Sequence, residues 1–413
     1  MLFKPSKAAG LSAQALQRLH APANAAVETG DVPGVIALAW KSGQILDLHA
    51  VGVADVSSRR PMERSTIFPI ASMSKPVTVT AALRLMEQGR LRLEDPITDW
   101  APEFADMRVL KRSDGPLDET YPAPRAITIE DLMTHRSGLS YGFTARGPLG
   151  AELLKTFGYG LDSPMTPDAW MQALAALPLA CAPGERFEYG HSIDLLGFIL
   201  GRAAGCSVQE VMRRELFEPL GMTDTGFWVL SEKRGRFVTN AMSTSVGEFT
   251  PTPIAWFTTP EPGVYASGGQ GLVSTADDFL AFARMLVRGG QTDRGPLLKR
   301  DTVRLMTTNR LTQDQRQAGF MGMPFFTSLG FGLGVSVVMD AHKHAAMGAG
   351  GVGAFGWPGL FGGWWQADPA NDMVLIWLQC CMPPPPQPGS MPRMPGARAM
   401  VEFQRAAYAV VNG

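Results

Sequence analysis

The pattern of apolar and polar positions changes twice along this chain. Residues 11–28 have the spacing of an amphipathic helix, and two apolar runs within 35–55 flank Lys41-Ser42-Gly43, which predicts a hairpin of two strands. Strand-like runs return only near the C-terminus, before a closing helix expected at 397–411. The later strands are expected at 329–340, 354–367 and 373–379.

Helical periods dominate the part between these strand-forming ends, and a further helix is expected to begin at Ser274 or Thr275. The economical arrangement is an α/β (α+β) fold: both ends of the chain build one antiparallel sheet, terminal helices cover a face, and a mostly helical domain is inserted. We expect the discontinuous α/β domain at 1–95 and 265–413, the helical domain at 96–264, and a ligand site in the cleft between them. Helices inside the insertion are expected at 128–135, 168–177, 194–205 and 208–222.

Composition excludes several classes of protein. The 413 residues are 45% hydrophobic and 18% charged, which is typical of a globular protein with two or three structural units. A net charge of −1 provides no basic surface for nucleic acid, and no stretch has the length of a membrane-spanning helix. The four cysteines show no C-x-x-C spacing, and the first twenty residues lack the apolar core of a secretion signal. We therefore expect reduced thiols and a cytoplasmic protein.

One short stretch combines a hydroxyl, an amine and the start of an apolar helix. Ser-Met-Ser-Lys at 72–75 is the only S-x-x-K in the chain, and the residues that follow are apolar nearly all round until Gln88-Gly89. Residues three apart on a helix are neighbours, so Lys75 Nζ can reach Ser72 Oγ. Pro76 is tolerated only in a first turn, which places the helix start near Ser72. A buried amine tends to be neutral and can then accept a hydroxyl proton; the alternative is a cap and a surface charge.

Four stretches, in order along the chain, resemble the serine β-lactamase and DD-peptidase superfamily, especially its class-C-like family VIII carboxylesterases. The resemblance spans nearly the whole chain and implies the β-lactamase/DD-peptidase-like fold, with an antiparallel sheet flanked by helices and an inserted helical domain. The similar segments are 62–78 around Ser72, the structural segment 130–142, the stretch 183–200 with Tyr189-Gly190-His191 as the second motif, and 353–369 with Trp357-Pro358-Gly359 as the third.

The resemblance implies a role for each matched residue. Ser72 would be the nucleophile, Lys75 its partner, and Tyr189 the proton shuttle that also serves the leaving group. The oxyanion hole would come from the N–H groups of Ser72 and Leu360. We expect the third motif to run along an edge strand, where the N–H of Leu360 points to the same side of the strand as residue 358, toward the cleft. Pro358 has no N–H, which fits an unpaired side facing the cleft.

Two departures from the usual motifs bear on the substrate. Trp357 stands where β-lactamases and transpeptidases usually carry a lysine that supports binding of a substrate carboxylate, and an indole offers an apolar wall instead. The second motif ends in His191, where asparagine is common. Both changes favour neutral, short-chain esters over peptides or β-lactams. The expected oxyanion and substrate-binding residues are Leu360, Trp357, Gly359, His191 and Tyr141, with the Met- and Phe-rich loop 319–331 beside them.

Other candidate residues have weaker contexts. Ser140 lies in a G-x-S-x-G match, but a helical segment precedes it where that elbow requires a strand. His135 is expected to hold a loop by hydrogen bonds. The H-x-H at 342–344 lacks a nearby carboxylate or cysteine, so we expect no metal and no cofactor. Trp364 and Trp365 are expected on opposite faces of a strand.

The sequence therefore predicts a serine carboxylesterase that cleaves small-molecule esters through an acyl-enzyme on Ser72. Acyl transfer to an alcohol on the same machinery, as in the similar lovastatin-type acyltransferases, stays open, and so does a β-lactamase or D-amino-acid peptidase. A non-catalytic binder that kept the fold is disfavoured because Ser72, Lys75 and Tyr189 are all retained. The pattern leaves the physiological ester, the acyl length and the oligomeric state undetermined. The Pro-rich stretch 382–396 is expected to be a surface connection.

Overall fold

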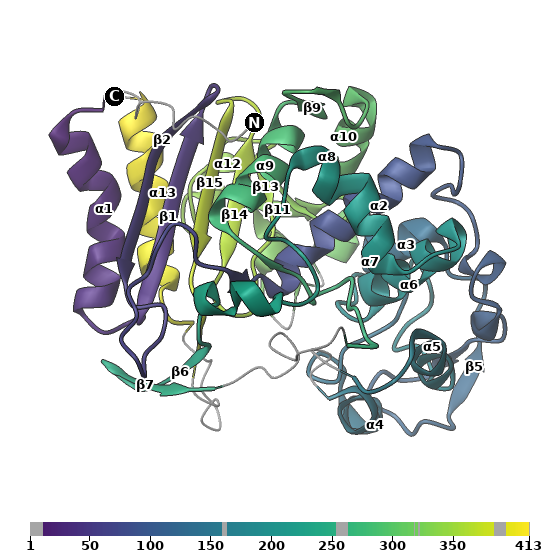
Figure 1. The fold of residues 1–413 in the computed structure, drawn as a ribbon. Helices are drawn as coiled ribbons and strands as arrows, with labels where there is room; N and C mark the ends of the chain where they lie inside the picture. The colour runs from purple at the N-terminus through teal and green to yellow at the C-terminus, as the bar shows by residue number, and fades with distance from the viewer. Residues whose placement is uncertain are drawn as a thin grey trace.

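Both ends of the chain build one antiparallel sheet, as the hydrophobic pattern predicts. The computed structural model describes residues 11–158, 163–252, 263–317, 319–320, 323–383 and 394–412. Its main sheet has seven strands in the order β11-β12-β13-β14-β15-β1-β2. The N-terminal hairpin of β1 (Gly34–Lys41) and β2 (Gln44–Gly52) therefore pairs with β15 (Met373–Leu378), a strand from the far end of the chain (Figure 1).

Alternation along β1 decides which layer each side chain joins. Val35, Ala37 and Ala39 pack with α1 (Ala13–Glu28) and α13 (Ala397–Asn412), whereas the intervening residues of β1 join the main core on the opposite face. Figure 1 shows α1 and α13 side by side on one face of the sheet, while α9 (Ala276–Val287) contacts β14 and β15. The hairpin turn needs positive φ at Ser42 (+47°) and Gly43 (+92°), which glycine adopts readily.

Two of the expected strands are in fact hairpins. The run at 329–340 divides into β11 (Leu329–Phe331) and β12 (Ser336–Val338), and the run at 354–367 divides into β13 (Phe355–Gly356) and β14 (Trp364–Asp368). Because β13 pairs with β12 on one side and β14 on the other, it is not an edge strand. The residues of the third motif follow β13 in a loop, so the edge-strand reasoning about Pro358 is wrong.

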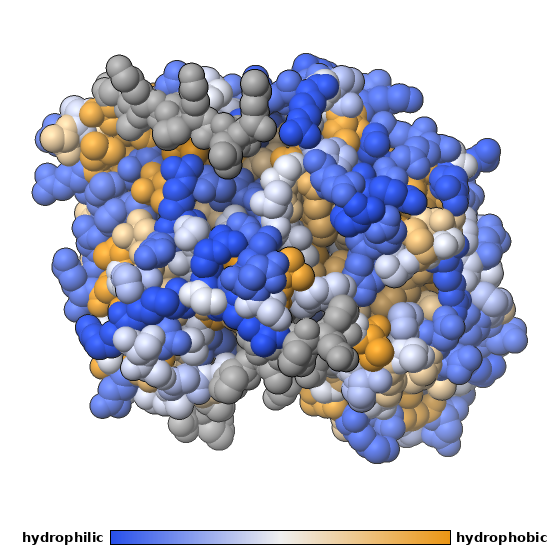
Figure 2. Space-filling model, in the orientation of Figure 1, coloured by the Kyte–Doolittle hydropathy of each residue, from blue (hydrophilic) through white to orange (hydrophobic). Residues whose placement is uncertain are grey.

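The helical part lies beside the sheet, and the buried helix α2 (Ser74–Glu87) packs on its α6 (Ser192–Ala204) (Figure 1). Figure 2 shows hydrophilic residues predominating on this face, with apolar residues in the recess between the sheet and the helical part. The proposed domain boundaries stay a prediction. The other helices are α3 (Ile129–Met133), α4 (Gly147–Phe157), α5 (Pro167–Ala175), α7 (Val208–Met212), α8 (Glu218–Leu220), α10 (Arg300–Met306), α11 (Gln313–Gln317) and α12 (Ala341–His344). The short strands are β3 (Phe68–Pro69), β4 (Arg108–Leu110), β5 (Thr120–Pro122), β6 (Ala241–Ser245), β7 (Glu248–Pro251), β8 (Val273–Ser274), β9 (Gln291–Thr292), β10 (Gly295–Pro296) and β16 (Cys381–Met382).

Local signals set several helix ends as expected. Thr275 caps α9 by accepting from the Asp278 N–H at 3.2 Å, and α2 ends at the predicted place, where Gly89 adopts φ +73°. Within the described part of the chain, no single helix is long and apolar enough to cross a bilayer. Only when α6 and the segment 208–220 are taken together, as a pair bent by 83°, are the length and composition sufficient. Most of the Pro-rich stretch 382–396 lies outside the described residues.

Candidate active site

Ser72 sits in a tight turn at the entrance to a buried helix. The turn is a 3₁₀ segment, Ala71–Met73, which leads directly into α2. Ala71 adopts φ +45°, a left-handed conformation that is unfavourable for a residue with a Cβ and that the surrounding structure must hold in place. The Ile70 N–H donates to Leu272 O at 2.9 Å, and Ser74 Oγ accepts from the Leu272 N–H at 3.1 Å. The turn is thus fixed on the strand-forming segment around β8.

Lys75 and Tyr189 both contact the Ser72 hydroxyl. Lys75 Nζ lies 3.1 Å from Ser72 Oγ, and the Tyr189 hydroxyl lies 2.8 Å from the same oxygen. Lys75 is fully buried, and its amine also donates to Gly269 O at 2.9 Å. The amine is 4.6 Å from the centroid of the Tyr189 ring. The structure therefore brings the three predicted residues into one hydrogen-bonded group, from a turn, a helix and a distant loop.

The loop that carries Tyr189 is held by close backbone packing. A Cβ on Gly190 would stand 2.1 Å from Leu139 O, so only glycine fits where this loop crosses the 139–140 segment. Thr144 Oγ1 donates to Tyr189 O at 2.7 Å, and Trp357 Nε1 donates to the Tyr189 hydroxyl at 3.4 Å. Trp357 is 2% exposed within an aromatic cluster, so this indole both walls the site and contacts the phenol.

A buried carboxylate, that of Asp194, accepts hydrogen bonds from residues that surround Lys75 and Tyr189. It accepts hydrogen bonds from Ser267 Oγ, from the Gly269 N–H at 3.1 Å and from the Tyr141 hydroxyl at 2.8 Å. Because the Gly269 carbonyl accepts from Lys75, one residue, Gly269, links this carboxylate to the active-site amine through its N–H and its C=O. Burial raises the pKa of Asp194, but its close contact with His191 and the charge of Lys75 outweigh burial, and the pKa lies below its ordinary value.

His191 and Tyr141 lie deeper than the sequence led us to expect. His191 is 1% exposed, its Nδ1 lies 3.5 Å from Asp194 Oδ2, and its ring contacts those of Trp170 and Phe157. It does not line the open cavity beside Tyr189. Tyr141 is also fully buried, with its ring beneath the Lys75 amine at 5.3 Å. Both side chains therefore lie beneath the site, next to the carboxylate of Asp194.

His135 is a neutral neighbour of the site. Its Nδ1 accepts from the Gly190 N–H at 3.4 Å, and its ring centroid lies 4.6 Å from that of Tyr189. Burial first, and then the charge of Lys75, hold the pKa of His135 well below 6.5. This fits its expected part in holding a loop, since its backbone carbonyl also accepts from the Glu188 N–H at 2.7 Å.

The third motif approaches the nucleophile through its backbone. A Cβ on Gly359 would stand 2.6 Å from Ile70 O, so the motif loop lies directly against the turn that carries Ser72. The Gly359 N–H donates within its own loop, to Gly363 O at 2.7 Å. Among the described residues, the Leu360 N–H has no hydrogen-bond partner. The loop can therefore present a free backbone donor near Ser72 even though it is not an edge strand.

The other candidate residues named from the sequence lie outside this hydrogen-bonded group. Ser140 donates to Glu188 Oε1 at 2.7 Å, and the residues around it form neither the strand nor the helix that a nucleophile elbow requires. Trp364 packs toward α1 and α13 while Trp365 contacts Phe279 of α9, so the predicted opposite facing of the two is confirmed. Within the described ranges, no group of three or more His, Cys, Asp or Glu side chains is placed to hold a metal ion.

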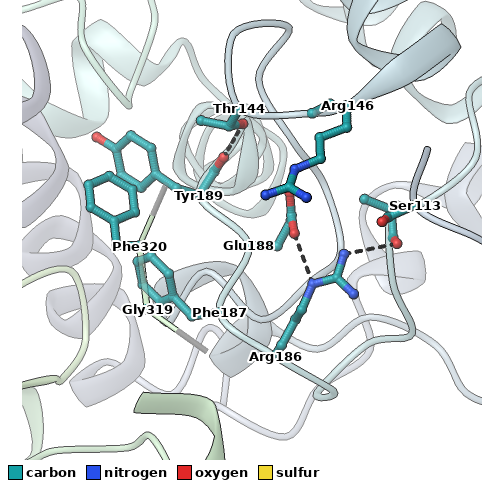
Figure 3. Close-up of a pocket in the computed structure, with 11 residues that line it drawn as sticks. Ser113, Thr144, Arg146, Arg186, Phe187, Glu188, Tyr189, Gly319 and Phe320 are labelled. Atoms are coloured by element: carbon teal, nitrogen blue, oxygen red, sulfur yellow. Dashed lines mark hydrogen bonds and ion pairs between the residues drawn. The ribbon is translucent and has the colours of Figure 1, made fainter. Parts of the chain in front are cut away.

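A cavity of about 260 Å³ opens beside Tyr189 (Figure 3). Phe187, Tyr189 and Phe320 form one end of it, and Arg146 and Arg186 stand at the other, on either side of Glu188. Phe320 belongs to the loop 319–331, which was expected to line a pocket, whereas the polar end was not anticipated. Of the three residues that share hydrogen bonds at Ser72, only Tyr189 is among the residues that line this cavity.

A serine hydroxyl flanked by an amine and a phenol, at the junction of an antiparallel sheet and a helical part, defines the class of serine β-lactamase-like proteins. The family model described as Beta-lactamase matches residues 17–393, and the chain belongs to this family. It is 43% identical to Protein Rv1367c of Mycobacterium tuberculosis over 85% of this chain and 86% of that protein. It is 33% identical to Esterase EstB of Burkholderia gladioli over 64% of this chain and 68% of that protein.

A solved structure has the same fold over nearly the full length. It is EstCE1, described as a hydrolase with promiscuous acyltransferase activity, and it superposes with a TM-score of 0.78 at 26% identity. The match covers 95% of this chain and 98% of that one. The expected β-lactamase/DD-peptidase-like fold is therefore confirmed.

Proposed function

We propose that the protein is a serine carboxylesterase of the family VIII kind, which cleaves small-molecule esters through an acyl-enzyme on Ser72. The observation that carries the proposal is the shared contact of Ser72 Oγ with the Lys75 amine and the Tyr189 hydroxyl. A hydroxyl between two groups able to exchange protons is the arrangement needed for an activated nucleophile. The name of EstB, a relative one third identical, supports ester hydrolysis.

In the acylation step, Ser72 Oγ attacks the ester carbonyl carbon and its proton passes to the Lys75 amine. The carbonyl electron pair moves to oxygen, where the N–H groups of Ser72 and Leu360 would stabilise the negative charge. When the tetrahedral intermediate collapses, the bond from carbon to the alcohol oxygen breaks. Tyr189 gives its proton to that oxygen and is reprotonated from Lys75. Water then repeats the sequence in reverse, releasing the acid and restoring the serine.

The wall around the nucleophile supports a neutral, short acyl group. Trp357 packs edge-on against Phe331 at 5.1 Å and Phe325 at 5.8 Å, so an uncharged aromatic surface borders the site where many relatives in the superfamily carry a lysine. An apolar acyl chain gains by burial there, whereas a charged one would be desolvated without a partner.

Acyl transfer is the second candidate, because EstCE1 is described as a hydrolase with promiscuous acyltransferase activity. Both outcomes share the acyl-enzyme and differ only in whether water or an alcohol attacks it. Adding a primary alcohol during turnover and measuring the new ester against the free acid separates them. A reduced intracellular environment, hence a cytoplasmic protein, is supported by the four free cysteines Cys181, Cys206, Cys380 and Cys381.

The test is hydrolysis of nitrophenyl esters from acetate through octanoate by the native protein, Ser72→Ala and Ser140→Ala. We expect short chains to be preferred, Ser72→Ala to lose at least about a thousandfold in kcat/KM, and Ser140→Ala to keep its activity. A fluorophosphonate should add its mass to Ser72 alone. Full activity of Ser72→Ala, or nitrocefin turnover faster than that of every ester, would contradict the proposal.

A further inference from the structure

The cavity beside Tyr189 has a charged end that the ester chemistry at Ser72 leaves without a role. Three of its lining residues carry guanidinium or carboxyl groups: Arg146, Arg186 and Glu188. Figure 3 shows both guanidinium groups near the Glu188 side chain, with Ser113 on the far side of Arg186. The question is whether these charges neutralise one another or leave one cation for a ligand.

Glu188 is already satisfied by other partners. Arg186 Nε donates to Glu188 Oε2 at 3.1 Å, and Ser140 Oγ donates to Oε1 at 2.7 Å. Arg186 also donates to Ala180 O at 3.1 Å, so its guanidinium is fixed by structure. Arg146 differs, because it makes no ion pair or hydrogen bond to any described residue. Of the two guanidinium groups in the cavity, that of Arg146 is therefore available to a ligand.

The opposite end of the cavity is aromatic. The Phe320 ring lies edge-on to the Tyr189 ring at 5.1 Å and to the Phe187 ring at 5.8 Å. Such a surface favours a flat or apolar body, while a guanidinium forms paired hydrogen bonds with a carboxylate. The two ends together match a small amphiphile with an apolar or aryl body and an anionic end.

We propose that this cavity binds the alcohol half of the ester, and that this half carries a carboxylate held by Arg146. The inference rests on the proposed function, because it uses Tyr189 as the donor to the leaving oxygen. The leaving group must contact Tyr189, and the cavity is lined by that same residue. The acyl half faces Trp357 and stays neutral. The third motif thus has Trp357 in place of a lysine, while the cation for the substrate, Arg146, stands on the side of the leaving alcohol.

The test compares two esters that differ only in charge, 4-acetoxybenzoate and 4-acetoxybenzamide. We expect the native protein to cleave the carboxylate ester with a kcat/KM about five- to tenfold higher, chiefly through KM, as one exposed charge-assisted hydrogen bond allows. Arg146→Gln should abolish this preference and Arg146→Glu should reverse it. Arg112→Gln is the matched control, because Arg112 is 70% exposed on the neighbouring loop and does not line the cavity. It should keep the native preference.

Equal cleavage of both esters by the native protein would overturn the inference, as would a preference that survives Arg146→Gln or is lost in Arg112→Gln. Binding of the product 4-hydroxybenzoate to Ser72→Ala, measured by calorimetry, tests the cavity without turnover. Adding Arg146→Gln to that protein should weaken binding about fivefold, and unchanged binding would refute the site. If no nitrophenyl ester is cleaved, the proposed function fails, and the calorimetry alone then decides for or against the cavity.

Discussion

Replacing Asp194 by Asn should separate the positioning of the active-site amine from the overall stability of the fold. The buried carboxylate accepts from Ser267, Tyr141 and the Gly269 N–H, and the carbonyl of the same residue, Gly269, accepts from the Lys75 amine. Asparagine has nearly the same shape. Its oxygen can keep two of these bonds, and its amide can donate to the Tyr141 oxygen, so the fold should survive with the negative charge removed.

The expected loss follows from the hydrogen bonds involved. A hydrogen bond to a charged group contributes about 1.5–3 kcal/mol, and a neutral one about 1 kcal/mol. If the weakened Gly269 contact lets the Lys75 amine leave Ser72 Oγ, a loss of about 1.5–3 kcal/mol in transition-state stabilisation corresponds to about 10–150-fold in kcat/KM. The assay is hydrolysis of nitrophenyl acetate, corrected for the folded fraction by circular dichroism, together with the rate of fluorophosphonate labelling.

The matched control is Asp131→Asn. Asp131 is also a buried carboxylate, 3% exposed, but it caps α3 and pairs with Arg125 away from Ser72. It should lower the melting temperature while leaving the activity of the folded protein intact. Our reasoning about Asp194 would be refuted if Asp194→Asn kept its activity within threefold, or if Asp131→Asn lost as much activity per folded molecule.

Three further predictions follow from single contacts. Trp357→Phe removes the indole donor that reaches the Tyr189 hydroxyl at 3.4 Å, and since one neutral hydrogen bond is lost, kcat per folded molecule should fall about two- to tenfold. The smaller ring leaves a cavity in a buried cluster, so the melting temperature should fall as well. An unchanged kcat would dismiss that contact. Gly190→Ala places a Cβ 2.1 Å from Leu139 O, and urea unfolding should show a loss of about 1–3 kcal/mol or more together with lost activity; native stability would be the contrary result. Burial raises the pKa of Asp278 from 3.8 to about 6, so between these values the folded protein holds a proton that the unfolded chain lacks, and stability falls as pH rises through that window. Asp278→Asn should therefore be more stable than the native protein at pH 7.5 and no more stable at pH 4, and the same difference at both pH values would count against this assignment.

The large features of the fold could be predicted because each rests on a periodic signal. The alternation in β1 and the all-round apolar character of α2 require burial whatever their neighbours are. The strands 329–340 and 354–367 were harder, since each contains a glycine-rich reversal between two very short strands. Gly334 adopts φ +74° in the first, and Gly362 adopts φ +87° in the second. Apolar runs interrupted by glycine do not show where pairing stops, so the position of β13 within the sheet was missed.

The site was predictable to a similar extent. Ser72, Lys75 and Tyr189 lie in motifs, and the structure places them together, while their catalytic roles stay predictions. Asp194 was missed, although it had a signal: it is the only acidic residue in the apolar stretch 192–201, where a charge needs a buried partner. Arg146 had no such signal, because an arginine in a loop is ordinary until a cavity is found beside it.

The geometry also implies that the site forms only when the sheet and the helical part pack together. Ser72 and Lys75 come from the start of α2, Tyr189 precedes α6, and Trp357 follows β13. The Lys75–Ser72 contact lies within one helical turn, whereas the hydrogen bonds from Tyr189 to Ser72 and from Trp357 to Tyr189 join segments far apart in the sequence and depend on tertiary packing. In Gly190→Ala, the added Cβ should loosen this packing, so activity should be lost at urea concentrations where the helices are still folded. Activity that disappeared only with the far-ultraviolet circular dichroism signal would show that the two parts do not separate first.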